Sequence, residues 1–260
     1  MIIDTHTHIY PHKISNAAVS SISDFYDVEM SLDGTLETLI QKGTEAGVDK
    51  FVVHSVATTA NQVESINNFI ISSVNEYPDR LIGFMTMHPD YTDFEKEMER
   101  AAENGLKGIK LHPDFQKFSI DDPKMFPLYE AASGKMPILF HTGDPRYQYS
   151  NPYRVAKILD NFPKLQVIGA HFAGWSEWDN AIKDLKGYRL WVDTSSSSHW
   201  LSDEKLKELI NFYGDDYVMF ASDYPMWSAK DELERLYKLR LPESLMEKIL
   251  YKNATQLLGL

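Results

Sequence analysis

Residues 2–8 read IIDTHTH, a short apolar run that ends in two histidines. Seven further short apolar runs follow along the chain, and each ends in polar or histidine-containing sequence. They are 51–57 (FVVHSVA), 81–88 (LIGFMTMH), 107–112 (KGIKLH), 137–142 (PILFHT), 166–172 (QVIGAHF), 189–195 (RLWVDTS) and 217–223 (YVMFASD). Short apolar runs bounded by turn residues are typical of buried strands, so the sequence predicts eight of them.

Segments with the apolar spacing of helices lie between most of these runs. Thr92, followed by Glu95, predicts a capping box at the start of one helix. Another helix is expected between Ser202, a typical N-cap residue, and Gly214, a typical residue after a helix end. Strands and helices therefore alternate along the chain.

After the first strand the units recur about every 28 residues, the spacing of βα repeats in parallel sheets. Eight such units predict an α/β fold, a distorted (β/α)8 TIM barrel that forms one domain over residues 1–260. We expect the longer segment 9–50 to add a lid or side insertion before its helix. A doubly wound open sheet is the alternative topology, although no GxGxxG motif follows a strand.

Composition narrows the function further. The chain has 260 residues with 26 Lys or Arg, 38 Asp or Glu, no cysteine and nine histidines, for a formal net charge of −12. Without cysteine there is no disulfide, no Cys-ligated zinc and no thiol catalysis, so histidines and carboxylates are the available strong metal ligands. The acidic charge without a Lys/Arg run argues against nucleic-acid or membrane partners. No signal peptide or membrane span is recognisable, and we expect a soluble cytoplasmic protein.

Chemistry in such a barrel takes place at the C-terminal ends of the strands, where the histidines gather. His6 and His8 are two residues apart on one strand, so both imidazoles point to the same face and reach one cation. Asp4 is expected on that face, orienting a ligand histidine. His141 and Asp223 supply a third and a fourth ligand of the kind that zinc takes.

The motifs DTHTH (4–8), FHTG (140–143), GAHFAG (169–174), ASDYP (221–225) and NATQLLGL (253–260) resemble those of the amidohydrolase superfamily, specifically its amidohydrolase-related group of metal-dependent hydrolases and decarboxylases. The resemblance covers essentially the whole chain. It implies one divalent ion, usually Zn²⁺, bound by His6, His8, His141 and Asp223. It also implies that His171 activates or orients the metal-bound water.

These roles agree with the chemistry of the residues. A divalent cation lowers the pKa of bound water to near 7, so hydroxide is present at neutral pH. Asp223 is placed to accept that proton and deliver it to a leaving group, and His171 to hydrogen-bond the water or the substrate oxygen. Lys110 is ambiguous: it is either a carbamylated ligand that bridges two metals or an interior cation paired with a carboxylate. Mn²⁺ and a second ion are therefore alternatives to a single Zn²⁺.

Residues for substrate binding are less well defined. Arg146 follows the fifth strand and is expected to bind a substrate carboxylate, although a surface salt bridge is an equal alternative. His112 is expected at the barrel mouth, either contacting substrate or capping a loop. His54 is expected to pack in the interior and His88 to be a strand-end candidate for the pocket.

The preferred function is a metal-dependent hydrolase that activates water for attack on the amide, ester or lactone carbonyl of a small, carboxylate-bearing substrate. The alternative within the same architecture is a metal-dependent, non-oxidative decarboxylase of an aromatic or unsaturated acid. A catalytically silent binding barrel is a third hypothesis, disfavoured by the complete ligand set. A homodimer is a further expectation, with the aromatic segment around Trp175 and Trp178 as an interface.

Overall fold

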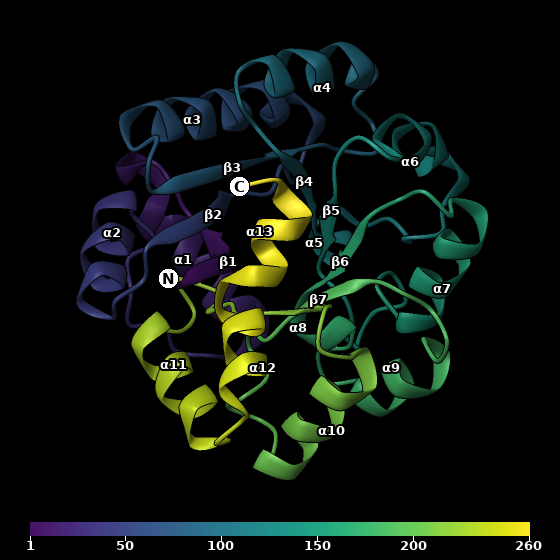
Figure 1. The fold of residues 1–260 in the computed structure, drawn as a ribbon. Coiled ribbons are helices and arrows are strands. Elements are labelled where there is room, and N and C mark those ends of the chain that lie inside the picture. Colours follow the sequence, from purple (N-terminus) through teal and green to yellow (C-terminus); the bar gives the residue numbers. More distant parts are fainter.

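The computed structural model describes residues 1–260 and contains one eight-stranded parallel sheet in the order β1 to β8. The strands are β1 (Ile3–His8), β2 (Lys50–His54), β3 (Leu81–Thr86), β4 (Gly108–Leu111), β5 (Ile138–Phe140), β6 (Val167–Gly169), β7 (Trp191–Asp193) and β8 (Val218–Met219). All eight predicted strands are present in the predicted order, and helices surround them (Figure 1). The (β/α)8 barrel prediction is confirmed.

The helices follow the strands in alternation. They are α1 (His12–Tyr26), α2 (Leu36–Glu45), α3 (Val63–Glu76), α4 (Phe94–Glu103), α5 (Pro113–Gln116), α6 (Phe126–Ala132), α7 (Pro152–Asn161), α8 (Ala170–Ala173), α9 (Trp178–Asp184), α10 (Asp203–Tyr213), α11 (Ala229–Lys238), α12 (Glu243–Glu247) and α13 (Asn253–Leu258). Two 3-10 turns, η1 (Ala60–Gln62) and η2 (Pro123–Met125), and a π-helical turn, η3 (Lys248–Lys252), complete the elements.

The two helix-start predictions had different outcomes. The hydroxyl of Ser202 accepts a hydrogen bond from the Lys205 amide, so it caps α10 as predicted. The capping box at Thr92 is wrong, because α4 begins one residue later with Asp93 at its N-cap and no side-chain cap bond. A terminal helix residue is the hardest to place from sequence, since one turn has several nearly equivalent starts.

The barrel closes where β1 meets the segment around β8. The Thr5 amide donates to the Phe220 carbonyl (3.0 Å), and the His8 amide donates to the Tyr224 carbonyl (2.7 Å). This closure brings the C-terminal end of β1 beside the residues that follow β8. It therefore places the first and last predicted ligand segments next to each other.

The register of β1 changes along its length. Ile3 and Asp4 pair with Lys50 and Phe51 of β2, whereas Thr7 pairs with Val53 after an irregularity between Asp4 and Thr7. An inserted residue in one strand reverses the alternation of side chains beyond it. For this reason Asp4 does not share the orientation of His6, contrary to the sequence-based expectation.

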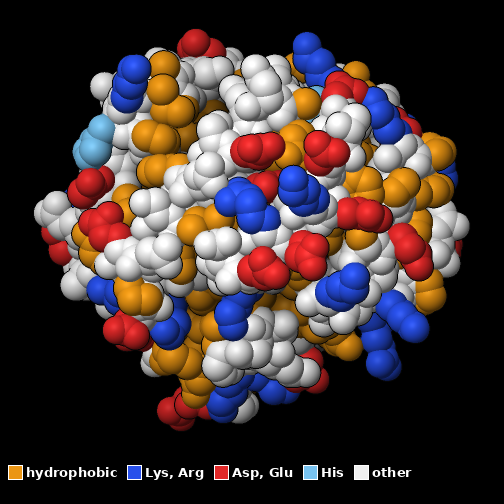
Figure 2. Space-filling model, turned by 90° about the horizontal axis from the view of Figure 1, so that it is seen from above, with side chains coloured by type: hydrophobic (Ala, Val, Ile, Leu, Met, Phe, Trp, Pro, Cys, Tyr) orange, Lys and Arg blue, Asp and Glu red, His pale blue; other side chains and the backbone are white.

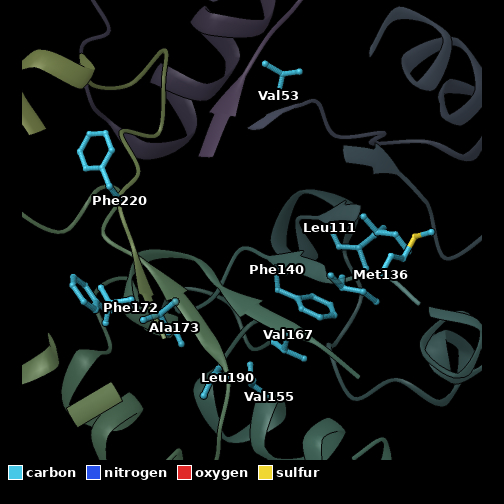
Figure 3. Close-up of a cluster of buried hydrophobic side chains, with 14 of the residues drawn as sticks. Val53, Leu111, Met136, Phe140, Val155, Val167, Phe172, Ala173, Leu190 and Phe220 are labelled. Atoms are coloured by element: carbon cyan, nitrogen blue, oxygen red, sulfur yellow. The ribbon is translucent and has the colours of Figure 1, made fainter. Parts of the chain in front are cut away.

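The barrel interior has an apolar level at the end opposite the histidines. Seven strand side chains, one from α8 and three from α13 form one buried cluster: Ile3, Val52, Ile82, Phe84, Leu139, Ile168, Met219, Ala170, Ala254, Leu257 and Leu258. Helix α13 covers this end of the barrel, which faces the viewer in Figure 1. In the layer between the strands and the outer helices, Phe140 of β5 and Val167 of β6 pack with Val155 of α7 as part of the larger core cluster (Figure 3).

The segment between β1 and β2 is an insertion, as predicted. It contains α1 before the expected helix α2, and Ile22 and Tyr26 of α1 line the same small cavity as His6 and His8. None of the helices combines the length with the apolar composition needed to cross a bilayer. Acidic and basic side chains are interspersed on the face shown in Figure 2, with apolar side chains exposed between them.

Shortening a buried side chain of α13, the helix that covers this end of the barrel, is expected to destabilise the fold. Leu257 is 9% exposed within the interior cluster, whereas Leu260, three residues later, is 42% exposed. Leu257→Ala is expected to lower the free energy of unfolding by about 2–4 kcal/mol, because it removes buried methyl groups and leaves a cavity. Leu260→Ala is the matched control and is expected to change it by less than about 0.5 kcal/mol. Urea unfolding measures both changes. Equal effects would contradict the buried packing of α13 against the end of the barrel.

Candidate metal centre

Three side chains converge at the C-terminal end of the barrel. Nε2 of His6 lies 3.1 Å from Nε2 of His8. Oδ1 of Asp223 lies 3.3 Å from the first of these nitrogens and 3.5 Å from the second. One triangle of two nitrogens and one oxygen therefore joins the ends of β1 and the β8 loop.

The size of this triangle fits a shared cation. Ligand bonds to a zinc-like ion are about 2.0–2.2 Å, and in a tetrahedral arrangement they separate ligand atoms by roughly 3.3 Å. The three observed separations lie between 3.1 and 3.5 Å. The residues present thus fit a divalent metal ion.

Asp193 orients His6 from the side away from the triangle. Its Oδ2 lies 2.9 Å from Nδ1 of His6, and its carboxyl is fully buried. Burial raises the pKa of Asp193, but the contacts with His6 outweigh this and lower it to about 2. An ionised carboxylate accepts the Nδ1 proton, which leaves the Nε2 lone pair of His6 directed at the centre.

His171 and His141 form a second pair. Nε2 of His171 lies 3.1 Å from Nδ1 of His141, and the His171 ring stacks 5.3 Å from that of His6. Nδ1 of His171 is 3.1 Å from the Ser195 carbonyl, to which it donates, so Nε2 carries the lone pair. Nε2 of His141 has no hydrogen-bond partner.

The backbone around His171 is held in an unusual conformation. His171, Phe172 and Ala173 have φ of 59°, 52° and 52°, in the left-handed region. Each such residue costs on the order of 1–3 kcal/mol and persists only where the surroundings determine it. The amide of His171 donates to Asp193 Oδ1 (2.9 Å), so the carboxylate that orients His6 also holds this turn.

Asp223 also has a left-handed backbone, with φ of 65°, and its amide donates to the His6 carbonyl (3.0 Å). The hydroxyl of Ser196 donates to Oδ2 (2.5 Å), and the Trp227 indole donates to Ser196 Oγ (3.0 Å). With Oδ2 engaged, Oδ1 is the oxygen that faces the histidines. Burial raises the pKa of Asp223, yet the neighbouring histidines, first His6, hold it well below the usual range.

Lys110 is buried in the centre of this arrangement. Its Nζ lies 3.0 Å from Nε2 of His6, and none of its surface is exposed. Burial lowers the pKa of Lys110 to about 8, with Asp223 and then Asp193 acting in the opposite direction. The lysine is therefore in place for either predicted role, and both remain open predictions.

All the predicted centre residues line one cavity of about 30 Å³, space for roughly one water molecule. They are His6, His8, Lys110, His112, His141, His171 and Asp223. His112 both caps α5 and faces the site, since its Nδ1 accepts from the Phe115 amide and its Nε2 lies 2.9 Å from the Tyr26 hydroxyl. Its ring stacks on that of His141 with 4.1 Å between centroids.

Arg146 lies outside this cavity. Its guanidinium makes two hydrogen bonds to the Asp144 carboxylate (2.9 and 2.8 Å) and one to the Phe25 carbonyl (2.8 Å). It also stacks over the Tyr26 ring, 5.4 Å from its centroid. In this structure Arg146 anchors the end of α1, and its role in binding a substrate carboxylate stays a prediction.

Two residues near the centre differ from expectation. The residue that orients His6 is Asp193, whereas Asp4 accepts from the backbone amides of Ser222 (2.9 Å) and His6 (3.3 Å). His54 is buried as predicted, but it also packs against His8 with 4.4 Å between ring centroids, and neither of its ring nitrogens has a partner. The signal for Asp193 was its place at the end of the seventh apolar run, equivalent to that of Asp223.

The other histidines lie away from the centre. His88 lines a separate surface pocket, where its Nδ1 accepts from the Asp90 amide. His12 is exposed and pairs with Glu37, and His199 stacks on Trp227. Trp178, part of the segment suggested for an interface, donates its indole N–H to the His171 carbonyl (3.1 Å). The homodimer stays a prediction.

The fold and the centre together define a TIM barrel with a histidine–carboxylate site for a divalent cation. A family model described as amidohydrolase matches residues 3–260, so the chain belongs to the amidohydrolase family. The 2-amino-3-carboxymuconate-6-semialdehyde decarboxylase of Dictyostelium discoideum is 28% identical in an alignment 244 residues long, which covers 75% of this chain. The match spans 66% of that relative, slightly less than two thirds of its length.

Solved structures share the fold over almost the whole chain. The 5-carboxyvanillate decarboxylase of Novosphingobium aromaticivorans, complexed with manganese and 4-hydroxy-3-methoxy-5-nitrobenzoic acid, has a TM-score of 0.77 and 18% identity, covering 100% of this chain and 96% of its own. A "probable 2-pyrone-4,6-dicarboxylic acid hydrolase" of Acinetobacter baumannii, with citric acid bound, has a TM-score of 0.75 and 16% identity, covering 100% and 99%. Decarboxylases and a hydrolase therefore both occur among similar proteins.

Burial of the histidines predicts a pH-dependent stability. Burial lowers the pKa of six of them, and five shift strongly: to about 3 for His8, about 4 for His171 and well below 6.5 for His54, His112 and His141; His88 is the sixth. Below about pH 6.5 these histidines bind protons in the unfolded chain, whereas in the folded chain they stay neutral to a lower pH. Burial also raises the pKa of Asp4 and Asp114 to about 7, so these two groups oppose the effect.

With five groups against two, the unfolded chain binds more protons between about pH 6.5 and 5. The free energy of unfolding of metal-free protein is therefore expected to fall on the order of 3 kcal/mol for each pH unit lost. Urea unfolding with EDTA at pH 7, 6 and 5 measures it. His54→Gln is expected to reduce the slope by about 1.4 kcal/mol per unit. Exposed His12→Gln is the control, and a flat profile would contradict the neutral histidine cluster.

Proposed function

We propose that this protein is a metal-dependent decarboxylase, which releases CO₂ from a small aromatic or unsaturated carboxylic acid. The comparisons support this reading better than the hydrolase that the sequence favoured, since the curated relative is a decarboxylase and a structure with the same fold is a carboxyvanillate decarboxylase. The observation that carries the metal dependence of the proposal is the triangle formed by His6, His8 and Asp223 at one end of this barrel.

His6, His8 and Asp223 are proposed to hold one divalent ion, with His141 as the fourth ligand. Burial holds the pKa of His8 and His141 low, so both are neutral and have a lone pair to offer at physiological pH. When bound, the ion would act as a Lewis acid toward the substrate oxygens. The carboxyvanillate decarboxylase holds manganese, so Mn²⁺ ranks beside the Zn²⁺ expected from the sequence.

Decarboxylation breaks the bond between the substrate carbon and its carboxylate, and a new carbon–hydrogen bond forms at the same carbon. The proton has to be carried by a side chain at the centre. Oδ1 of Asp223 and Nε2 of His171 are the two atoms available, because Ser196 occupies the other oxygen and Ser195 the other nitrogen. We assign proton delivery to Asp223: its carboxylate would first take up a proton from water and then pass it to the carbon that loses CO₂, while His171 orients the substrate.

The walls of the centre suit the loss of CO₂. Apolar and aromatic side chains line the cavity beside the polar ligands: Ile22, Tyr26, Met30, Phe115, Pro225 and Met226. The available volume of about 30 Å³ is that of roughly one water molecule, so a substrate group that enters the centre displaces this water. A dry site favours conversion of a charged carboxylate into neutral CO₂, and it limits competing hydrolysis.

The reaction is tested with protein reconstituted with Mn²⁺ or Zn²⁺. 5-Carboxyvanillate, 2,6-dihydroxybenzoate and 2-amino-3-carboxymuconate semialdehyde serve as substrates, and lactones, esters and amides as rivals. We expect about one metal equivalent, release of CO₂, and one deuterium at the product carbon in D₂O. Cleavage of a lactone with uptake of ¹⁸O from water, without CO₂ release, would establish the hydrolase instead.

Asp223→Asn is expected to lower the turnover by at least about 1,000-fold, because the amide no longer delivers a proton. His141→Ala is expected to lower the metal content as well. Elemental analysis of both variants separates loss of ligation from loss of proton transfer. Two metal equivalents in the unaltered protein, falling to one in Lys110→Met, would identify Lys110 as a bridging ligand.

Asp193→Asn tests the orientation of His6. The amide keeps the size of the carboxylate but removes its charge, so the affinity for the metal is expected to fall about 10- to 100-fold. Competition with a chelating dye measures it, and exposed Asp24→Asn on α1 is the matched control. An unchanged affinity would show that Asp193 does not act through His6.

A further inference from the structure

A second, larger cavity opens beside the metal centre. It has a volume of about 660 Å³ and runs between α1 and the segment from β2 to α3. Ile14, Ala17 and Ala18 line it from α1, with Ile66 and Phe69 opposite on α3. The groove is open to solvent at Ile14, whose surface is 49% exposed.

This groove adjoins the metal centre. His8, Ile22 and Phe115 line both the groove and the small cavity of the ligands. The groove is therefore the large space next to a carboxylate placed at the centre. The groove is about twenty times larger than the cavity at the centre, so it is the main space for the rest of a substrate.

The chemistry of the groove is mostly apolar. Ten of its 19 lining residues are hydrophobic, and Lys117 is its one lysine or arginine. Asp114 is its one carboxylate; it is 4% exposed, and its Oδ1 has no hydrogen-bond partner although Ser150 donates to its Oδ2 (2.6 Å). A buried acceptor without a partner is stabilised by a hydrogen-bond donor. A hydroxyl or amine of the occupant is therefore expected only beside Asp114.

We infer that the substrate bears an extended apolar group, an alkyl chain or a further ring, which lies in the groove between α1 and α3. This inference rests on the proposed function, since it places the reacting carboxylate at the metal centre. Ala17 and Ala18 determine the width of the groove, because larger side chains at these positions would fill it. Residues of the insertion thus select the substrate by size and hydrophobicity.

The test measures binding separately from turnover. Calorimetry with the Mn²⁺-loaded protein compares benzoate with 3-pentylbenzoate and 4-pentylbenzoate, two positions that cover different directions from the ring. Each methylene buried in an apolar site strengthens binding about fourfold, so at least one pentyl compound is expected to bind more than about 30-fold tighter than benzoate. Equal affinities, or no binding of either pentyl compound, would overturn the inference.

Ala18→Phe, which fills the groove, is expected to reduce this ratio to within about threefold. Ala18→Leu is a milder filling variant in case the larger side chain disturbs α1, and it is expected to reduce the ratio partly. Ser20→Phe is the matched control, because Ser20 is exposed on the same helix and does not line the groove. A ratio that persists in both Ala18 variants would overturn the inference.

Two further measurements distinguish this inference from the proposed function and from self-association of the protein. If pentylbenzoate binds in an Ala18-dependent manner but no acid loses CO₂, the proposed function fails and the groove assignment stands. Sedimentation of the metal-loaded protein tests a second copy as the occupant. A dimer that Ala18→Phe dissociates, without any preference for the pentyl compounds, would overturn the inference and make the groove a self-association surface.

Discussion

The contact between Asp193 and His6 is the constraint on which the centre depends. One fully buried carboxylate accepts from the His6 ring through Oδ2, and through Oδ1 from the His171 amide and the Ser195 hydroxyl. It thereby holds the first strand, the turn after the sixth strand and the loop after the seventh in one arrangement. Because Asp193 is ionised and fixed, the lone pair of His6 points inward before any ligand arrives.

This preorganisation has a cost that the remainder of the barrel offsets. Buried ring nitrogens of His8, His54 and His141 lack partners, and the backbone at His171 and Asp223 is left-handed. Unpartnered buried polar atoms cost about 1–3 kcal/mol each. The apolar level closed by α13, together with the layer between strands and outer helices, supplies compensating burial at the other end of the same strands. Stability and chemistry are thus separated along the barrel axis.

The sequence predicted the fold well because its signals were local and repeated. Eight apolar runs each end in polar residues, and no single run has to be identified correctly for the barrel to be recognised. The candidate metal ligands could be recognised for the same reason, since strand ends of a barrel meet at one mouth. Asp193 was missed although it ends a run as Asp223 does, because nothing in one sequence tells which strand-end carboxylate faces a histidine.

Other expectations depend on features that only three-dimensional context determines. The expectation for Asp4 assumed uninterrupted alternation, and the irregularity in β1 reverses it. Arg146 was chosen for its closeness in sequence to His141, yet the Asp144 carboxylate and the end of α1 already use its donors. The motifs did not separate hydrolysis from decarboxylation, because both need the same ligands, and the ligands are what the motifs encode. The choice between them lies in the walls of the site.

The insertion between β1 and β2 supplies part of those walls. Helix α1 contributes Tyr26 above the ligand cavity and Ala17 and Ala18 beside the groove, while none of the strand-end ligands belongs to it. Arg146 fastens only its C-terminal end, through the Phe25 carbonyl. Side chains along α1 are therefore free to change the shape of the substrate space without moving His6, Asp193 or Asp223. In the proposed function, selection of the substrate and activation of the reacting carbon are carried by different parts of the chain, and they meet at His8, which borders both cavities.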